Sequence, residues 1–173
     1  MVMVLLAATV FIAGPQFQFR ELIASSATFQ SIVGEVSEAA ALNHVVPWVE
    51  RAPSRPLALV GIPITSTTSL RVPNNAVGQL RARFEFDVDA SHIPASGDTD
   101  AVASEKLQNS GIDFGNKVGA IIQEIMIESL NGGRLLIRSV DMIEPGITLS
   151  KKYERASLGD YMKVTVVANY GAA

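Results

Sequence analysis

The sequence has two histidines, and neither has the neighbours that a histidine-based site needs. His44 lies in an alanine-rich segment and His92 in a turn-rich one, with no second histidine beside either. No carboxylate lies at helical ligand spacing from His44, so a histidine metal site is not expected. No recognisable nucleophile elbow offers a serine for a Ser-His-Asp triad. We therefore expect both histidines to be surface or structural residues.

The other candidates for a chemical site are an acidic segment and two phosphate-binding loop motifs. Asp87, Asp89, Asp98 and Asp100 could suggest calcium, but His92 stands where an EF-hand loop needs its glycine. The segment is therefore predicted to be a solvated acidic loop. Neither G-x-x-x-x-G-K-[ST] nor G-x-G-x-x-G occurs, so phosphate-binding loops are not expected. The sequence predicts no catalytic residue, metal or cofactor, and no enzymatic activity.

The charge of the chain gives no reason to expect specific nucleic-acid binding. The formal net charge is -3, whereas nucleic-acid proteins present a basic face. Lys151, Lys152 and Arg155 gather around Tyr153, a cluster more typical of a solvated hairpin than of a nucleic-acid patch. The absence of cysteine excludes disulfides, thiolate zinc sites and cysteine nucleophiles.

Length and composition indicate one domain with extensive interfaces. The 173 residues are long enough to bury a core, and we expect a single domain over residues 1–173. Charged residues make up only 18% of the chain, against a usual share of about 25%. A chain so poor in charge resembles a subunit that buries much of its surface against copies of itself.

The first 14 residues, MVMVLLAATVFIAG, are apolar and carry no charge. A membrane-spanning helix needs about 20 apolar residues, and this run ends at Gly14-Pro15. A signal peptide would begin with a positive charge and end in a small-residue cleavage site, and the run does neither. Export and membrane anchoring are the alternatives. We expect burial instead, inside the subunit or against a neighbour.

The next segment predicts three short helices. Apolar residues recur at helical spacing from Phe19 onward. Ser26 and Ser37 are placed to cap the second and third helices, and the third is expected to end before Pro47. A proline-rich connection then leads to a short buried strand at residues 57–62.

A long arm and a strongly alternating strand follow. In residues 79–88 apolar side chains alternate with charged ones, which indicates a strand with one face in the core. Residues 63–78 are far too many for a tight hairpin turn, and Arg71 is their only charge. We expect these residues to form a projecting hairpin arm. A flexible loop is the alternative, and the sequence favours neither over the other.

The charged face of this strand is a candidate subunit interface. Arg81, Arg83, Glu85 and Asp87 are predicted to point away from the core and to pair with a neighbouring subunit, or to face water alone. Arg71 on the arm is predicted to contact a neighbour as well.

A central helix is the clearest in the chain. Its apolar stripe is Phe114, Val118, Ile121, Ile122 and Ile125, and it is expected to end at Gly132-Gly133. Asp113 is the predicted N-cap, after a weak separate helix at 101–107. Gly111, Gly115 and Gly119 form a smooth strip that another backbone could approach closely.

Three further strands are expected, at residues 134–141, 147–153 and 161–170. Helices followed by strands, one helix and more strands indicate an α+β domain. The predicted architecture is an antiparallel sheet with the N-terminal helices and the central helix packed on one face.

Five quoted segments resemble one family in their order. FRELIASSATFQSIVG, SEAAALNHVV, QLRARFEFDVD, FGNKVGAIIQEI and IRSVDMIEPGITLSKKYERASLGDYMKVTVVANYG are similar in order and style to tail terminator and tail-completion proteins of long-tailed bacteriophages. The match covers most of the chain but contains no signature motif, and the apolar residues 1–13 depart from it.

The resemblance implies a non-enzymatic virion structural protein. Such a subunit forms a ring, usually hexameric, that caps the tail tube and joins it to the neck below the capsid. Its partners would be copies of itself, the tail tube and the neck or connector proteins, with no membrane. DNA would pass through the ring without specific binding, and the protein would be made in the host cytoplasm and reside in the virion. The alternatives are a head-tail adaptor, a tail tube protein or, last, a small ligand-binding domain.

Overall fold

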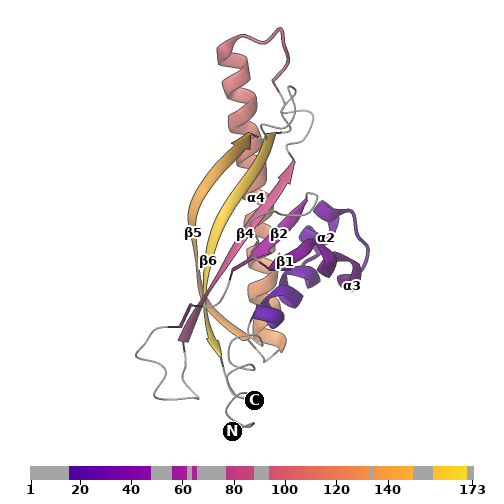
Figure 1. Cartoon of the computed structure of the whole chain (residues 1–173), viewed down its shortest axis with the longest axis vertical. Coiled ribbons are helices and arrows are strands. Elements are labelled where there is room, and N and C mark those ends of the chain that lie inside the picture. Colours follow the sequence, from indigo (N-terminus) through magenta and orange to yellow (C-terminus); the bar gives the residue numbers. More distant parts are fainter. Residues whose placement is uncertain are drawn as a thin grey trace.

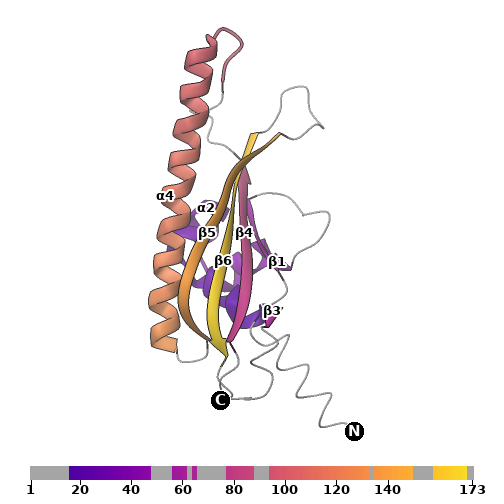
Figure 2. The same ribbon diagram turned by 90° about the vertical axis from the view of Figure 1, so that its left-hand side faces the viewer.

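The computed structural model describes residues 16–47, 56–61, 64–65, 77–87, 94–132, 135–149 and 158–170. These residues form a twisted sheet with helices on one of its faces (Figures 1 and 2). The α+β class and the placement of the helices on one face confirm the prediction from sequence. The single-domain boundary remains a prediction, and the apolar residues 1–14 lie outside the described part.

The sheet contains six described strands in the order β1-β2-β4-β6-β5, with β3 also paired to β4. All pairs are antiparallel except β1 and β2, which are parallel. The sheet is therefore mixed rather than purely antiparallel. The strands are β1 (Val45–Pro47), β2 (Leu57–Val60), β3 (Ile64–Thr65), β4 (Val77–Asp87), β5 (Leu135–Leu149) and β6 (Leu158–Tyr170).

Both predicted serine caps on the N-terminal helices are confirmed. Residues 16–25 are helical, followed by α2 (Ala27–Val33) and α3 (Glu38–Ala41). Ser26 Oγ accepts a hydrogen bond from Phe29 N at 3.0 Å, and Ser37 Oγ accepts one from Ala40 N at 3.3 Å. Each bond satisfies an amide that the first helical turn would otherwise leave unpaired. Gly34 ends α2 with a φ of 74°, a conformation that glycine adopts without steric cost.

The third helix is shorter than predicted. After α3 the chain forms a 3-10 turn, η1 (Leu42–His44), and then the strand β1. Val45 is fully buried and pairs with Ala58 of β2. Arg20 Nε donates to the Val45 carbonyl oxygen at 2.8 Å. The β-branched valines fit a strand better than a helix end, and this tertiary pairing overrides the helical continuation.

One helix of 33 residues, α4 (Asp100–Gly132), replaces the two predicted helices. Asp113 is therefore an interior residue and not a cap, and the prediction was wrong. Val102 N donates to Thr99 Oγ1 at 3.4 Å, so the capping group precedes residue 100. Gly111 costs a helix about 1 kcal/mol but does not end it. The N-terminal turns of α4 extend past the end of the sheet (Figure 2).

The strands predicted at 134–141 and 147–153 are one strand, β5, which pairs with β6 from Leu135 to Leu149. Pro145 and Gly146 lie inside it, where a break was expected. Proline is tolerated because β5 is an edge strand of the described sheet, where one side of the strand has no neighbouring strand to bond. The pairing register between β5 and β6 shifts at two irregularities, one between Ile137 and Ser139 and one between Met142 and Glu144.

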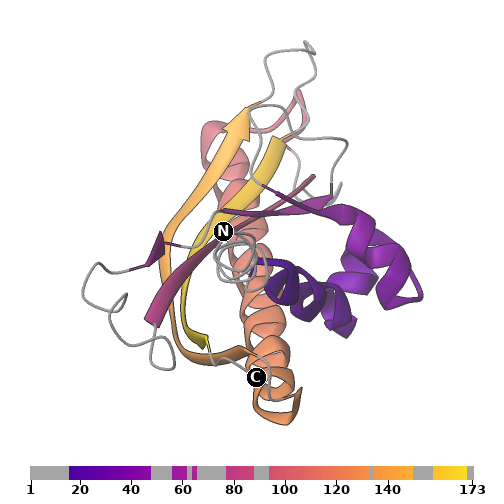
Figure 3. The same ribbon diagram turned by 60° about the horizontal axis from the view of Figure 1, so that its bottom comes forward.

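The core lies between the helices and the sheet. α4 covers β5 and β6, and the N-terminal helices lie beside α4 on the same side (Figure 3). The helix-facing side chains of β4 and β6 are buried against them. The largest fully buried side chains of this cluster are Phe19, Phe29, Phe84, Phe114, Ile23, Leu80, Ile121 and Ile125.

A carboxylate on α4 ties the helix to the N-terminal segment. Glu124 Oε2 accepts from Ser26 Oγ at 2.6 Å and from Thr28 N at 3.1 Å, and Oε1 accepts from Thr28 Oγ1 at 2.5 Å. A negative group at the start of α2 is also favoured by the helix dipole. Burial alone would raise the pKa of Glu124, but the hydrogen bonds from Ser26, Thr28 and the Ala27 amide outweigh it and lower the pKa.

Replacing Glu124 tests this tie. Because its folded pKa lies below the ordinary value of 4.5, Glu124 stabilises the fold above that pH. The contribution is lost as the pH falls through the folded pKa. E124Q should lower the free energy of unfolding by about 1–3 kcal/mol at pH 7 and flatten the loss of stability in acid. Urea unfolding from pH 7 to pH 3 measures both effects.

The matched control is E128Q, because Glu128 is exposed on the next turn of the same helix. Equal stability and equal acid sensitivity of E124Q and the unmodified protein would contradict the tie.

Candidate functional site

The charged row of β4 lies on the face of the sheet opposite the helices. Leu80, Ala82 and Phe84 are buried in the core, and the alternation places the odd-numbered residues on the other face. Arg81 is exposed and Arg83 is half-buried there. The predicted orientation of these two residues is confirmed. Their role in subunit contacts remains a prediction.

Arg83 is held by its own subunit. Its guanidinium lies 4.4 Å from the centroid of the Tyr161 ring, a cation–π contact. Its Cα partner on β6 is Lys163, and Lys163 in turn pairs with Glu144 of β5. Arg83 thus contributes to the fold, whereas the exposed Arg81 is open to a partner.

The other predicted interface residues are placed only in part. Glu85 and Asp87 pair with Tyr161 and Gly159 of β6, which places their backbone on the same row. Arg71 lies outside the described residues. Two basic positions are therefore followed by two acidic positions along this row of β4.

The base of the predicted arm is a paired hairpin. Ile64 pairs with Gln79 and Thr65 pairs with Gly78. The loop between the paired strands is therefore shorter than the predicted range of residues 63–78. Gly61 N donates to the Arg81 carbonyl oxygen at 2.6 Å, and a Cβ on Gly61 would lie 3.2 Å from Arg81 Cβ. This close approach favours glycine there. Residues 66–76 lie outside the described part, and the projecting arm remains a prediction.

A second exposed surface was missed from the sequence. We call it the outer stripe of α4, made of Ile112, Asn116, Gly119, Gln123, Ile127 and Leu130. The intervals of four and three residues follow the helical period, so these side chains share one face. Ile112 and Ile127 are each 52% exposed and Leu130 is 69% exposed. Large apolar side chains on one exposed helix face indicate an interaction surface.

The charged residues of the same helix segment lie elsewhere. Asp113, Lys117, Glu124 and Glu128 follow a separate line, between the outer stripe and the buried one. The outer stripe therefore carries no charge from Ile112 to Leu130. Among the predicted glycines, a Cβ at Gly111 or Gly119 would meet nothing within 4 Å, whereas one at Gly115 would touch Met162 Cε at 3.7 Å. The helix surface is open at the first two positions and covered by β6 at the third.

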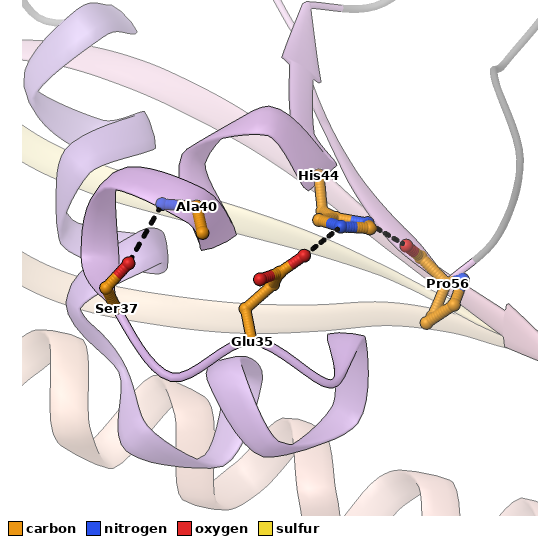
Figure 4. Close-up of polar contacts among 5 residues, drawn as sticks. All are labelled: Glu35, Ser37, Ala40, His44 and Pro56. Carbon is orange, nitrogen blue, oxygen red and sulfur yellow. Dashed lines mark hydrogen bonds and ion pairs between the residues drawn. The ribbon is translucent and has the colours of Figure 1, made fainter.

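His44 has a structural role, as the sequence predicted. Its Nδ1 lies 3.1 Å from the Pro56 carbonyl oxygen and its Nε2 lies 3.4 Å from Glu35 Oε1 (Figure 4). The first contact joins η1 to the residue before β2, and the second joins it to the segment after α2. His92 lies outside the described residues.

One further carboxylate is buried in the core. Asp160 is 2% exposed and its Oδ2 accepts from Ser110 Oγ at 2.6 Å. This bond joins β6 to α4 near the point where the helix leaves the sheet.

Within the described ranges, no three histidine or acidic side chains lie close enough together to hold a metal ion. Among the helices of those ranges, none has the length and apolar character to cross a membrane.

Comparison with known proteins gives a distant likeness among solved structures. No protein-family model and no curated protein matches the sequence. Among solved structures, the chain is similar to a chain of the "Virion of native gene transfer agent (GTA) particle". The TM-score is 0.41 and the identity 11%, over 92% of this chain and 93% of that one. Similarity at this level does not establish a shared fold, so the function is argued from the residues of this chain.

The two arginines of the β4 row should behave differently when reversed. R81E should weaken self-association more at low than at high salt, because Arg81 is exposed and its interactions are screened. R83E should instead lower stability by about 1 kcal/mol, because it removes the contact with Tyr161. Light scattering at two salt concentrations and thermal melting separate the effects. Self-association of R81E that is unchanged at both salt concentrations would assign this face to solvent.

Proposed function

We propose that this chain is a non-enzymatic virion structural protein, a ring-forming tail terminator or neck subunit that joins the tail tube to the head-proximal connector. The order of elements supports the proposal. Helices precede a paired hairpin, and a central helix precedes the last strands, as the resemblance to tail terminators implies. The composition agrees, because only 18% of the residues are charged.

The observation that carries the proposal is the presence of two separate exposed surfaces. The outer stripe of α4 lies on the helix side of the subunit, and Arg81, the exposed residue of the β4 row, lies on the sheet face opposite the described helices. Figure 2 shows these two sides of the described sheet. A closed ring is built from heterologous contacts, in which one surface of a subunit meets a different surface of the next. A subunit with a single self-complementary interface would form a dimer instead. Two unlike surfaces on opposite sides suit a ring.

The polar side chains that join elements of the fold support a structural role. His44, Glu124 and Asp160 each form a hydrogen bond that joins two elements of the fold. They lie in three separate places and do not converge on a common point. A small ligand-binding domain would instead gather such groups around a pocket.

Electron microscopy of the purified full chain in negative stain tests this proposal. The expected image is a closed ring with six-fold symmetry and a central opening. Stacked rings or long tubes would favour the alternative of a tail tube protein. A field of single small particles at all concentrations would contradict the proposal.

The paired hairpin offers a second test. Residues 67–76 can be replaced by Asn-Gly, so that a two-residue turn is flanked by positions 66 and 77, the next pair in the register of β3 and β4. Because the pairs Ile64–Gln79 and Thr65–Gly78 are kept, the variant should fold and melt like the original chain. The arm is proposed to contact a neighbour, so the variant should be monomeric in light scattering. A variant that assembles as before would remove the arm from the interface.

A further inference from the structure

The outer stripe of α4 is a long, uncharged surface that the described part of the chain leaves exposed. From Ile112 to Leu130 it spans 18 residues of helix, about 27 Å. Three of its six positions are large apolar side chains that are at least half exposed. The two middle polar residues, Asn116 and Gln123, are uncharged, and Gly119 offers no side chain. An occupant therefore needs apolar groups and no charge.

The same chain contains a segment of that chemistry. Residues 1–14 carry no charge and include the large apolar residues Val4, Leu5, Leu6, Val10, Phe11 and Ile12. Burying one such side chain fully contributes about 1.5–3 kcal/mol, so exposure of all six to water would be costly. Fourteen residues reach from about 21 Å as a helix to about 48 Å when extended, which covers the length of the stripe.

The position of the first described residues agrees with this occupant. The helix of residues 16–25 begins at the end of the subunit where α4 ends (Figures 1 and 2). Gln16 is fixed there, because its Nε2 donates to the Val60 carbonyl oxygen at 3.2 Å. Ile127 and Leu130, the most closely spaced apolar residues of the stripe, lie in the last turns of α4. The first described helix thus begins at the end of the subunit where the stripe is most apolar.

We infer that residues 1–14 of one copy dock on the outer stripe of α4 of a neighbouring copy. In the proposed assembly, a neighbouring subunit supplies the segment that covers the stripe. The inference rests on the self-assembly in the proposed function and names one of its contacts. It also explains the low charge at both surfaces, since a charge on either side would be buried without a partner.

Disulfide cross-linking tests the contact directly, because the chain has no cysteine of its own. One full-length variant carries L6C and a second carries L130C, and the two are mixed, assembled and oxidised. The matched control replaces L130C with E128C, which is exposed on the opposite side of the same turns. L6C should join to L130C in a dimer of unlike chains, at several times the yield with E128C.

Other results overturn the inference. An assembly in which L6C joins E128C as readily as L130C would remove the stripe as the docking site. Disulfides only between two L130C copies would show that two stripes meet each other. A chain carrying both cysteines that closes only within itself would place the contact inside one subunit. Absence of any assembly would overturn this inference together with the proposed ring, whereas assembly without the cross-link overturns the inference alone.

A substitution gives an independent measurement. L130E places a charge in the proposed contact, while Leu130 is 69% exposed and its replacement should leave the fold intact. The full-length variant should melt like the original chain and lose its assembly in light scattering. E128K, the control, should keep both. Assembly of L130E at the original size would contradict the contact.

Discussion

The packing of α4 against the sheet is the constraint on which the rest of the structure depends. Its buried stripe contributes Phe114, Val118, Ile121 and Ile125 to the core, each 2% exposed or less. The same helix covers β5 and β6 and contacts α2, so the N-terminal helices and the last strands are joined through it. Glu124 adds a polar tie at the start of α2. Loss of the helix would separate the two halves of the subunit.

The helix has three functions on three lines of side chains. The buried line forms the core, and the charged line includes Glu124, which orders the start of α2. The outer stripe is left for contacts outside the subunit. Three roles require a long and straight element, and the 33 residues of α4 are long by the standard of globular proteins. The placement of an uncharged line opposite the core is the basis for treating the chain as a subunit of a larger assembly.

Features set by local chemistry could be predicted from the sequence. Ser26 and Ser37 cap helices because a hydroxyl before a helical run reaches the free amides of its first turn. The alternation in β4 identified the core face, because a strand has a period of two residues. The class and the one-sided placement of the helices followed from the order of these elements.

Features that depend on contacts between residues far apart in the chain could not be predicted from the sequence. Val45 and Val46 form a strand because β2, which lies beyond a proline-rich connection, offers a partner. Pro145 lies within β5 because that strand is at an edge, and Glu124 meets Ser26 from 98 residues away. The outer stripe was available to sequence reasoning through its spacing of four and three residues. It was missed because the buried stripe of the same helix has the same period and stronger apolar residues.

The mass of the assembled protein tests the central claim most directly. Native mass spectrometry of the purified full chain should give a closed oligomer, and for a hexamer the mass is six times 18.4 kDa, about 110 kDa. A different closed oligomer would keep the account of a ring and change its symmetry. A single species at 18.4 kDa at every concentration would contradict the claim that this chain works by assembling with copies of itself.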